Sequence, residues 1–498
     1  MLIITIVLPK INSNLKKEIL LSKAYTITLK INKSGIHRIF YSGNDINSCG
    51  EISYNPDDIT INEITNPTVT DGYYNFQHGD NTIILSWNNE LVTFICLFNQ
   101  CTEINEIDLS NFDISNAKDM QSMFLGCSSL TSIKFGDNNP IYSTNTRWMF
   151  HGCSSLAFLN LSNFETSSVV YMDSMFCGCS SLTSVILSSF NTGNVITMGE
   201  MFRFCSSLKS LDLSHFNTEK VEIIFYMFNE CRNLTYLDVS NFNTSSVTVM
   251  DRVFKGCSSL TTLDVSKFDT SKVYNIAEMF YECSSIKTLD LSNFETSEVI
   301  HLDGMFNKCS SLTSLNLHNF HTPKAQFMFF MFNECTSLEY LDISNFNTEN
   351  VVRMEYMFNG CISLTTLEVS KFNTGKVENM RIMFGNCQKL TSLDVSHFNT
   401  ERVFDMGFMF YECRSLENLD LSNFKTSTVT AMDWMFEGCE KLKSLDVSKF
   451  DTSNVNNMEL MFHRCKSLTS LDLSNFDTSK VITMKDMVSH CNELTIIN

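Results

Sequence analysis

The chain has 498 residues and a formal net charge of −19 at pH 7, and 43% of its residues are hydrophobic while only 18% are charged. This hydrophobic fraction is enough for a folded core and excludes global disorder. The acidic balance argues against nucleic acid or an anionic membrane as the main partner, and no apolar run approaches the roughly 20 residues that span a bilayer.

The N-terminal hundred residues contain no repeat. The first nine are apolar, but no basic residues precede them and no small-residue cleavage site clearly follows, so the sequence predicts no signal peptide in this chain. Five later segments alternate polar and apolar residues between turn signals. These segments are residues 25–31, 37–41, 59–64, 82–87 and 91–96. We therefore expect a small antiparallel β domain over residues 1–100 that caps the repeats, with a ligand-binding role of its own as the alternative.

Residues 101–498 form an internal repeat. Sixteen of the nineteen cysteines follow one another at a spacing of 26 residues, from Cys101 to Cys491. The three cysteines outside this series are Cys49, Cys96 and Cys177. We call each 26-residue stretch a coil and number its positions as columns, starting from its cysteine. The sequence then contains fifteen complete coils and the start of a sixteenth.

Each coil combines two periods. Columns 4, 7 and 9 are apolar, as in Leu468-x-x-Leu471-x-Leu473, and the alternation at the end of this pattern predicts a short strand with one buried face. Columns 17, 20, 23 and 24 are also apolar, and their spacing would place them on one face of a helix. In the last complete coil these four residues are Val481, Met484, Met487 and Val488. We therefore interpret each coil as strand, turn and short helix.

A single coil cannot bury its own apolar residues, so the coils must stack and stabilise one another. The expected fold class is α/β: a right-handed leucine-rich-repeat-like solenoid of about fifteen 26-residue coils over residues 101–498, with an all-β cap domain at residues 1–100. The coil that begins at Cys127 is the most irregular, and residues 136–140 predict a bulge or a kink there.

The Leu-x-x-Leu-x-Leu strand resembles that of the leucine-rich repeat, but Phe in column 12 replaces the usual Asn two residues beyond the strand. This departure removes the ordinary asparagine ladder and puts an aromatic stack in its place. The longer pattern Leu-Asp-Leu-Ser-Asn-Phe-Asp-Thr-Ser-Lys-Val, followed by Met-x-x-Met-Phe and Cys-Ser-Ser-Leu, resembles the BspA-like leucine-rich repeat surface proteins. Their repeat is also catalogued as a mycoplasma domain of unknown function. The resemblance implies a surface-displayed protein with an adhesive or host-interaction role.

In a leucine-rich repeat, columns 6, 8 and 10 would face the concave surface. Column 8 carries a row of carboxylates: Asp108, Asp212, Asp238, Asp264, Asp290, Asp342, Glu368, Asp394, Asp420, Asp446 and Asp472. Like charges opposite one another on adjacent strands are destabilising, so the row needs a reason. The functional hypothesis is a surface for a basic protein, a cationic glycan or divalent cations; calcium is the weakest candidate because no Asp-rich calcium loop is present. The alternative is repeat duplication, with solvent and counterions screening the row.

The other recurrent polar columns have structural interpretations. Column 14 is Thr in thirteen coils, and we expect its hydroxyl to bond to the backbone at a turn rather than to ice. We expect buried free thiols in the cysteine column, because identical coils hold their Cβ vectors parallel and so disfavour disulfides. No spacing clusters cysteines as a zinc site requires, and the methionine columns are expected to fill the core.

The sequence contains no G-x-x-x-x-G-K-[ST], H-E-x-x-H or G-x-S-x-G signature, so we expect no enzyme activity, no cofactor and no metal site. The leading hypothesis is a binding solenoid at the cell surface or outside the cell that takes a protein or glycan ligand, basic in character, through the concave acidic row. One rival is a cytoplasmic scaffold for protein–protein interactions. The other is a spacer that displays the N-terminal β domain.

Overall fold

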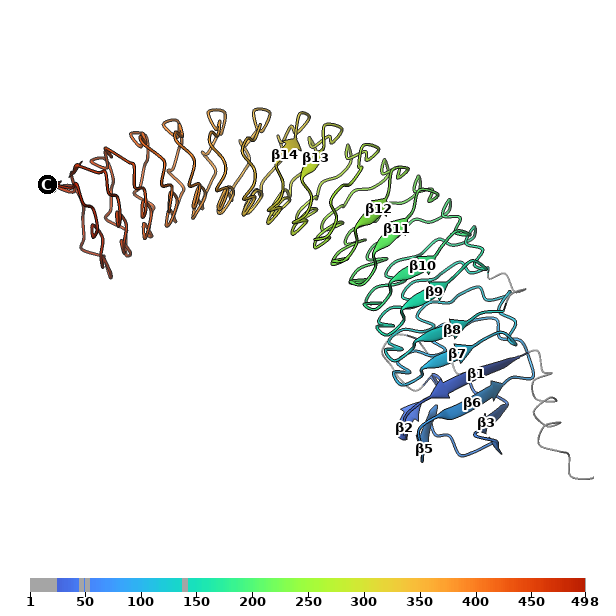
Figure 1. The fold of residues 1–498 in the computed structure, drawn as a ribbon. Helices are drawn as coiled ribbons and strands as arrows, with labels where there is room; N and C mark the ends of the chain where they lie inside the picture. The colour runs from blue at the N-terminus through green and yellow to red at the C-terminus, as the bar shows by residue number, and fades with distance from the viewer. Residues whose placement is uncertain (1–24, 44–48, 50–53, 137–141, 498) are drawn as a thin grey trace, which may run out of the picture. The chain divides into compact units, whose positions relative to one another are not determined.

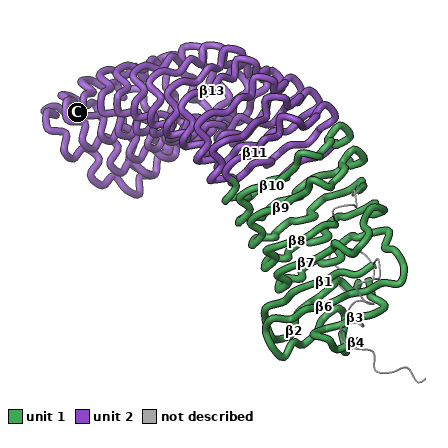
Figure 2. The backbone as a smooth tube through the Cα atoms, turned by 45° about the vertical axis from the view of Figure 1, so that its right-hand side comes forward, with its two compact units in different colours: residues 1–195, 201–208 green, residues 196–200, 209–498 purple. Residues whose placement is uncertain are grey.

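A computed structural model of the protein forms two compact units, which Figures 1 and 2 show. The described residues are 25–43, 49, 54–136 and 142–497. Unit 1 is Met1–Val195 with Met201–Leu208, and unit 2 is Ile196–Glu200 with Lys209–Asn498. Every regular element among the described residues is a β-strand. The described part of the chain accordingly contains no helix that could cross a lipid bilayer.

The N-terminal part of unit 1 is built on an antiparallel sheet that continues into the first repeat strands (Figure 1). Its six strands lie in the order β4-β3-β6-β1-β7-β8, and β2 pairs with β5 beside it. The bounds are β1 Thr26–Ile31, β2 Gly35–Arg38, β3 Asp58–Ile61, β4 Ile64–Thr65, β5 Tyr73–Phe76, β6 Asn81–Ser86, β7 Glu106–Asp108 and β8 Ser132–Lys134. Ile27 lies opposite Leu85 and Leu29 opposite Ile83, and all four side chains are buried.

Four of the five strands predicted in this region are confirmed, with shifted ends, as β1, β2, β3 with β4, and β6. The fifth, predicted over residues 91–96, is wrong. The backbone N–H groups of Phe94 and Phe98 donate to carbonyls of the first coil, those of Asp119 and Met123, at 3.0 and 2.8 Å. This is the bonding pattern of the turns in later coils, so the solenoid's turn segment already begins seven residues before Cys101.

Strand β1 lies antiparallel to β7, the strand of the first coil. Lys30 is opposite Glu106 in this pairing, and its Nζ lies 2.6 Å from Glu106 Oε2. The other edge of β7 pairs in parallel with β8 of the next coil. Both edges of β7 are therefore covered, and no open strand edge remains at this point of the sheet.

Short strands occupy columns 6–8 or 6–7 of ten coils. Beyond β8 they are β9 Phe158–Asn160, β10 Ser184–Ile186, β11 Ser210–Asp212, β12 Tyr236–Asp238, β13 Thr288–Asp290, β14 Ser314–Asn316, β15 Ser470–Leu471 and β16 Ile496–Ile497. They pair in parallel two by two, as β7–β8, β9–β10, β11–β12, β13–β14 and β15–β16. Leu211 pairs with Leu237, which confirms the 26-residue register. The coils that begin at Cys257 and at Cys335 through Cys439 have no strand here, so a regular count of fifteen strand-bearing coils is not supported.

The helix predicted in the second half of each coil is wrong, and with it the α/β class. Columns 19–26 form consecutive turns in which the N–H groups of columns 20, 22, 24 and 26 bond to the next coil, as when Met120 donates to the carbonyl of Asn145 at 3.0 Å. An α-helix would direct these N–H groups to its own carbonyls. Column 19 also forms parallel bridges from coil to coil, from Asp119 to Tyr171 in unit 1 and from Thr197 to Thr483 in unit 2. The protein is therefore a β-solenoid.

Two left-handed residues in each coil prevent a helix. Column 22 has a positive φ in every coil, even where the residue is bulky, as at Trp434 and Ile382, both at 57°. Column 26 is Gly in several coils, and at Gly360 an added Cβ would lie 3.3 Å from the Cα of Glu334. The left-handed conformation costs a non-glycine residue roughly 1–2 kcal/mol. We infer that the hydrogen bonds between coils, which this geometry allows, offset that cost.

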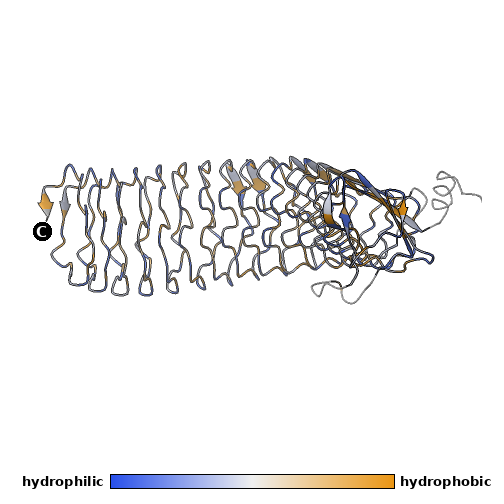
Figure 3. Ribbon diagram, turned by 90° about the horizontal axis from the view of Figure 1, so that it is seen from below, coloured by the Kyte–Doolittle hydropathy of each residue, from blue (hydrophilic) through white to orange (hydrophobic). Residues whose placement is uncertain are grey.

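The apolar columns line the interior as predicted, and hydrophobic and hydrophilic residues alternate around the coils (Figure 3). Leu234 and Leu260 of column 4 are fully buried in unit 2. The column-24 rings of Phe228 and Phe254 stack with centroids 5.7 Å apart and planes 6° apart. The prediction that equivalent side chains lie on top of one another is therefore confirmed for the aromatic column, and a continuous apolar interior results.

The cysteine column is a row of buried free thiols, as predicted; among the described residues only its last member, Cys491, is half-buried. Most of these thiols donate to the carbonyl of a column-24 Phe, as Cys283 Sγ does to Phe254 O at 3.1 Å, whereas Cys101 Sγ contacts the carbonyl of Asn99 at 3.9 Å. Burial raises the pKa of fully buried thiols such as Cys257, to about 12. Cys49 and Cys96, outside the series, form a disulfide, a pair for which the sequence offered no spacing argument.

Polar side chains also form ladders between coils. Thr166 Oγ1 donates to the carbonyl of Asn191 at 3.0 Å, and the N–H of Asn191 donates back to it at 2.7 Å, which confirms the backbone role predicted for column 14. An asparagine ladder exists as well, but in column 25: Asn333 Nδ2 donates to Asn307 Oδ1 at 2.8 Å, and Asn359 repeats the contact with Asn333 at 2.7 Å. This ladder was not predicted, because the leucine-rich repeat usually has its asparagines just beyond the strand and not in column 25.

Candidate functional site

The predicted carboxylates of column 8 lie on one side of the coils with the exposed residues of column 6, and we call this surface the strand face. In unit 2, nine of the ten predicted carboxylates are exposed and Asp238 is half-buried. Asp212, Asp238 and Asp290 end the strands β11, β12 and β13. The others occupy the same column in coils with or without a strand: Asp264, Asp342, Glu368, Asp394, Asp420, Asp446 and Asp472.

Each of these carboxylates makes a tight turn at the end of its strand segment. One oxygen accepts the backbone N–H of column 10, two residues later, as Asp342 Oδ1 does from Ser344 at 3.0 Å and Glu368 Oε1 from Ser370 at 2.9 Å. This is an Asx-type turn, in which a side chain completes a turn that the backbone cannot close alone. The second oxygen lies at the surface, where at Asp238 it accepts a hydrogen bond from Tyr236. Column 8 therefore has a structural role that the sequence analysis did not foresee.

Hydrogen bonds keep the row charged. At Asp238 the hydroxyl and the N–H of Ser240 lower the pKa of the carboxyl below its ordinary value. At Asp342 the N–H and the hydroxyl of Ser344 do the same. A carboxyl with a lowered pKa is fully ionised at pH 7 and loses its charge only below the usual range near 4. The strand face thus carries a permanent negative row.

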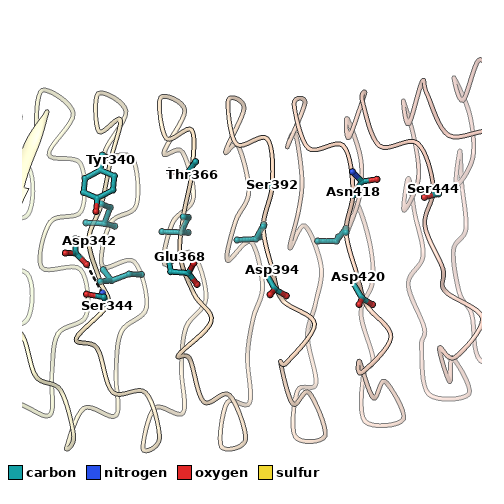
Figure 4. Close-up of a pocket in the computed structure, with 15 residues that line it drawn as sticks. Tyr340, Asp342, Ser344, Thr366, Glu368, Ser392, Asp394, Asn418, Asp420 and Ser444 are labelled. Atoms are coloured by element: carbon teal, nitrogen blue, oxygen red, sulfur yellow. Dashed lines mark hydrogen bonds between the residues drawn. The ribbon is translucent and has the colours of Figure 1, made fainter.

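Two grooves on the strand face of unit 2 gather seven of the carboxylates. The larger has a volume of about 920 Å³, and Figure 4 shows its carboxylates in a row along successive coils. They are Asp342, Glu368, Asp394 and Asp420. The smaller groove, of about 680 Å³, is lined by Asp238, Asp264 and Asp290. The structure places Asp212, Asp446 and Asp472 outside both grooves.

The two grooves are equivalent in register. The smaller contains Tyr236 and the larger Tyr340, which occupy column 6 in coils four repeats apart. These rings are 54% and 67% exposed, which is unusual for side chains of this size. The sequence analysis missed both, although a signal was present: they are large aromatic residues in a column of mostly small hydroxyl residues.

The larger groove lies where neighbouring coils do not pair at the strand face. No strand is assigned in the coils that begin at Cys335 through Cys439. Between these coils the bridges of column 19 are continuous, while columns 6–8 form no paired strands. The placement of columns 6, 8 and 10 on a concave surface stays a prediction.

The site has no metal-binding constellation. Among the described residues, no group of three or more His, Cys, Asp or Glu side chains converges as metal ligands. The carboxylates of the row belong to separate coils and are each bonded to their own turn, as Asp394 is to Ser396. What the row can do chemically is attract and hold positive charge along an extended line.

These features define a leucine-rich-repeat-like β-solenoid. The chain matches the family described as "Mycoplasma protein of unknown function, DUF285" over six stretches, the last five of them overlapping, that together cover most of its length. The matched residues are 51–139, 144–262, 226–339, 302–414, 327–445 and 388–496. The protein therefore belongs to this family, which confirms the resemblance predicted from the repeat. Among curated proteins, none has a significantly similar sequence.

Several solved structures are similar. A leucine-rich repeat protein from Eubacterium ventriosum is 15% identical, with a TM-score of 0.32, and the alignment covers 69% of this chain and 85% of that one. A leucine rich cell surface protein from Faecalibacterium prausnitzii is 20% identical, with a TM-score of 0.28 and coverage of 61% and 82%. A chain of the Drosophila Toll–Spatzle complex is 14% identical, with a TM-score of 0.26; the alignment covers 83% of this chain but only 46% of that one. Similarity at this level carries no functional conclusion.

Proposed function

We propose that this protein is a non-enzymatic binding solenoid, displayed at the cell surface, that holds a cationic segment of another protein along its acidic strand face. The supporting observation is a comparison of two columns that make the same turn with different chemistry. Column 13 forms the same Asx-type turn as column 8, with the N–H of column 15 as donor, for example Ser245 to Asn243 Oδ1 at 3.0 Å.

In column 13 asparagine and acidic residues share the turn almost equally. Six asparagines accept the bond: Asn191, Asn217, Asn243, Asn347, Asn373 and Asn399. Five acidic residues do so: Asp113, Glu165, Asp269, Asp451 and Asp477. In column 8 the same bond is made by eleven carboxylates and only two asparagines, Asn160 and Asn316. The turn does not require a charge, so the charge of column 8 has another use.

The expected partner follows from this charge. A row of ionised carboxylates is self-repelling, and a positively charged ligand relieves that repulsion. The two grooves are concave. The larger one is partly apolar, because Leu341, Leu367 and Leu393 line it together with the carboxylates. An extended basic segment fits such a surface better than a compact domain does.

Cysteine chemistry supports a location outside the cytoplasm. The disulfide between Cys49 and Cys96 is of the kind that persists in oxidising compartments. The free thiols of the cysteine column do not argue for the cytoplasmic alternative. They are buried and burial raises their pKa, as at Cys309, so they would resist oxidation in either compartment. Protease treatment of intact cells, followed by detection with an antibody, tests the location; protection of the protein until the cells are lysed would contradict it.

We further infer that about fifteen stacked coils extend over residues 101–498 and that the sheet formed by residues up to 100 caps the first of them. The pairing of β1 with β7 supports the cap, because it covers a strand edge that would otherwise be open.

Binding is tested with a variant that removes charge from column 8 but keeps its turns: Asp394→Asn, Asp420→Asn, Asp446→Asn and Asp472→Asn combined. The matched control removes the same charge from column 13, with Asp113→Asn, Asp269→Asn, Asp451→Asn and Asp477→Asn. The probe is a fluorescent octalysine peptide, followed by anisotropy. We expect the first variant to bind roughly ten-fold more weakly, because four exposed charge contacts are lost, and the control to stay near wild type.

Two titrations sharpen the result. Wild-type binding should weaken steadily with added salt, because the contacts are exposed charges. Binding should persist as the pH falls from 7 to about 4 and disappear below, because lowered carboxyl pKa values keep the row ionised over that range. Equal losses in the two variants would show only a general charge effect and would contradict the proposal.

A further inference from the structure

The protein itself shows how a tyrosine and an aspartate two residues apart can hold an arginine. In unit 1 the guanidinium carbon of Arg147 lies 4.1 Å from the centroid of the Tyr171 ring. The same side chain donates from Nε to Asp173 Oδ2 at 2.6 Å. The guanidinium stacks on the face of the ring, and the carboxylate accepts a hydrogen bond from its edge. The cation–π contact and the ion pair thus hold the same planar group. Tyr171-x-Asp173 is thus an arginine receptor built from one short segment.

The same Tyr-x-Asp spacing occurs twice on the strand face, at Tyr236-x-Asp238 in the smaller groove and Tyr340-x-Asp342 in the larger. In Figure 4, Tyr340 and Asp342 lie one above the other on the same coil. In the smaller groove the two side chains are close enough for Tyr236 Oη to donate to Asp238 Oδ2 at 3.3 Å. Both pairs therefore present a ring and a carboxylate oxygen together.

No cation of the described chain takes the place that Arg147 takes in unit 1. Neither Asp238 nor Asp342 forms an ion pair with a described residue. Lys371 and His318 lie near Asp342 and help to lower the pKa of its carboxyl, but the Lys371 ammonium donates to the carbonyl of Ser344, at 2.9 Å. The two exposed rings are left without a stacked guanidinium.

We propose that Tyr236-x-Asp238 and Tyr340-x-Asp342 are twin subsites for arginine side chains of one extended, basic segment of a partner protein. This inference rests on the proposed function and names the residue type that the strand face recognises. Arginine fits better than lysine because its planar guanidinium can stack on a ring and bond a carboxylate at the same time, whereas an ammonium is a hydrated point charge.

The register of the coils sets the spacing between the two arginines. The subsites are four coils apart, and paired strands lie about 4.8 Å from each other, so the subsites are separated by at least roughly 19 Å. An extended peptide advances about 3.4 Å per residue and covers this distance in about six residues. A segment with arginines at positions 1 and 7 can then occupy both subsites, and the second contact is made at high effective concentration.

The test uses synthetic peptides of glycine and serine with two arginines six positions apart, two lysines at the same positions, or one arginine, and measures their dissociation constants calorimetrically. The peptide with two arginines should bind about 5-fold more tightly than its lysine counterpart and at least 10-fold more tightly than the peptide with one arginine. Tyr340→Leu and Tyr236→Leu should each weaken it roughly 2- to 5-fold. Tyr274→Leu, which removes a ring that is 46% exposed and belongs to neither groove, is the control and should have no effect.

The outcomes separate this inference from the proposed function. If the arginine and lysine peptides bind alike, or if the Tyr236 and Tyr340 variants bind as wild type does, the subsites are refuted even when octalysine binding still depends on column 8. If octalysine binding is the same in the column-8 variant and wild type, the proposed function itself fails. A further peptide carries its two arginines three positions apart instead of six. If it binds as tightly as the original, the two subsites do not act together and the twin arrangement is refuted.

Discussion

The threonine ladder of column 14 offers a sharp test of how the coils hold together. Thr348 is fully buried in unit 2, and its Oγ1 donates to the carbonyl of Asn373 at 3.0 Å while accepting the N–H of Asn373 at 2.7 Å. Substitution of Thr348 by Val keeps the shape of the side chain and removes both bonds. The N–H and the carbonyl of Asn373, which is itself exposed, would then lose these two part-buried bonds.

The expected size of the effect follows from those two groups. A hydrogen bond of this kind stabilises a fold by about 0.5–1.5 kcal/mol, so the loss of both bonds predicts about 1–3 kcal/mol. Thr348→Ser keeps the hydroxyl and removes only a methyl group, which is worth about 1 kcal/mol. The order of stability should therefore be wild type, then Ser, then Val, whereas a purely apolar contact would place Val above Ser.

Amide hydrogen exchange is the appropriate assay, because a solenoid opens locally and a single unfolding midpoint does not report one coil. At 1.4 kcal/mol per ten-fold, a loss of about 2 kcal/mol speeds exchange of the peptides around residue 373 roughly 30-fold. Thr366→Val is the control, because Thr366 is exposed on the strand face and makes no such ladder. Exchange in Thr348→Val that is as slow as in Thr348→Ser would refute the argument.

Two further predictions concern buried groups of the coils. Arg464 Nη1 lies 3.0 Å from Glu412 Oε1 and 3.4 Å from Glu437 Oε1, and burial raises the pKa of Glu437. Arg464→Gln removes the counter-charge of these carboxylates, so it should lower the free energy of unfolding by about 1–3 kcal/mol at pH 7. This loss should shrink as the pH falls through the raised pKa, since protonated Glu437 no longer needs a counter-charge; a larger loss at pH 5 than at pH 7 would contradict it. The ladder thiols should not react with a thiol reagent in the native protein and should all react in denaturant, because burial raises their pKa, as at Cys413; rapid labelling of the native protein beyond Cys491 would argue against their burial.

The sequence predicted the repeat, the buried columns and the strand register because these depend on identity and spacing alone. An apolar residue that recurs in column 7 of every coil pairs with its equivalent in the next coil, as Leu289 does with Leu315. The acidic row was predicted for the same reason. Its turn was not, because a carboxylate that bonds its own backbone has the same sequence signature as one that awaits a ligand.

The helix was predicted wrongly because its signal was not unique. Residues at i, i+3, i+6 and i+7 share a face of a helix, but a chain of turns that points every third or fourth residue inward produces the same pattern. The glycines of column 26, such as Gly256 with φ of 75°, were the sequence signal against a helix, since Gly repeated at one position often marks a left-handed turn. Column 22 gave no such warning, because Tyr356 and Phe408 adopt the same conformation with large side chains.

Under the proposed function, stability and recognition belong to different columns of each coil. Backbone bonds between coils concentrate in columns 19–26, and side-chain bonds to the backbone in columns 1 and 14, so these columns hold neighbouring coils together even where the strands do not pair. The strand face is then free to carry costly features, such as aligned carboxylates and the exposed ring of Tyr340, without loss of the stack. A solenoid whose stability came from strand pairing could not open its sheet to form a groove of about 920 Å³ over consecutive coils. The separation of the two roles is the physical reason why the larger groove lies where the strands of unit 2 are interrupted.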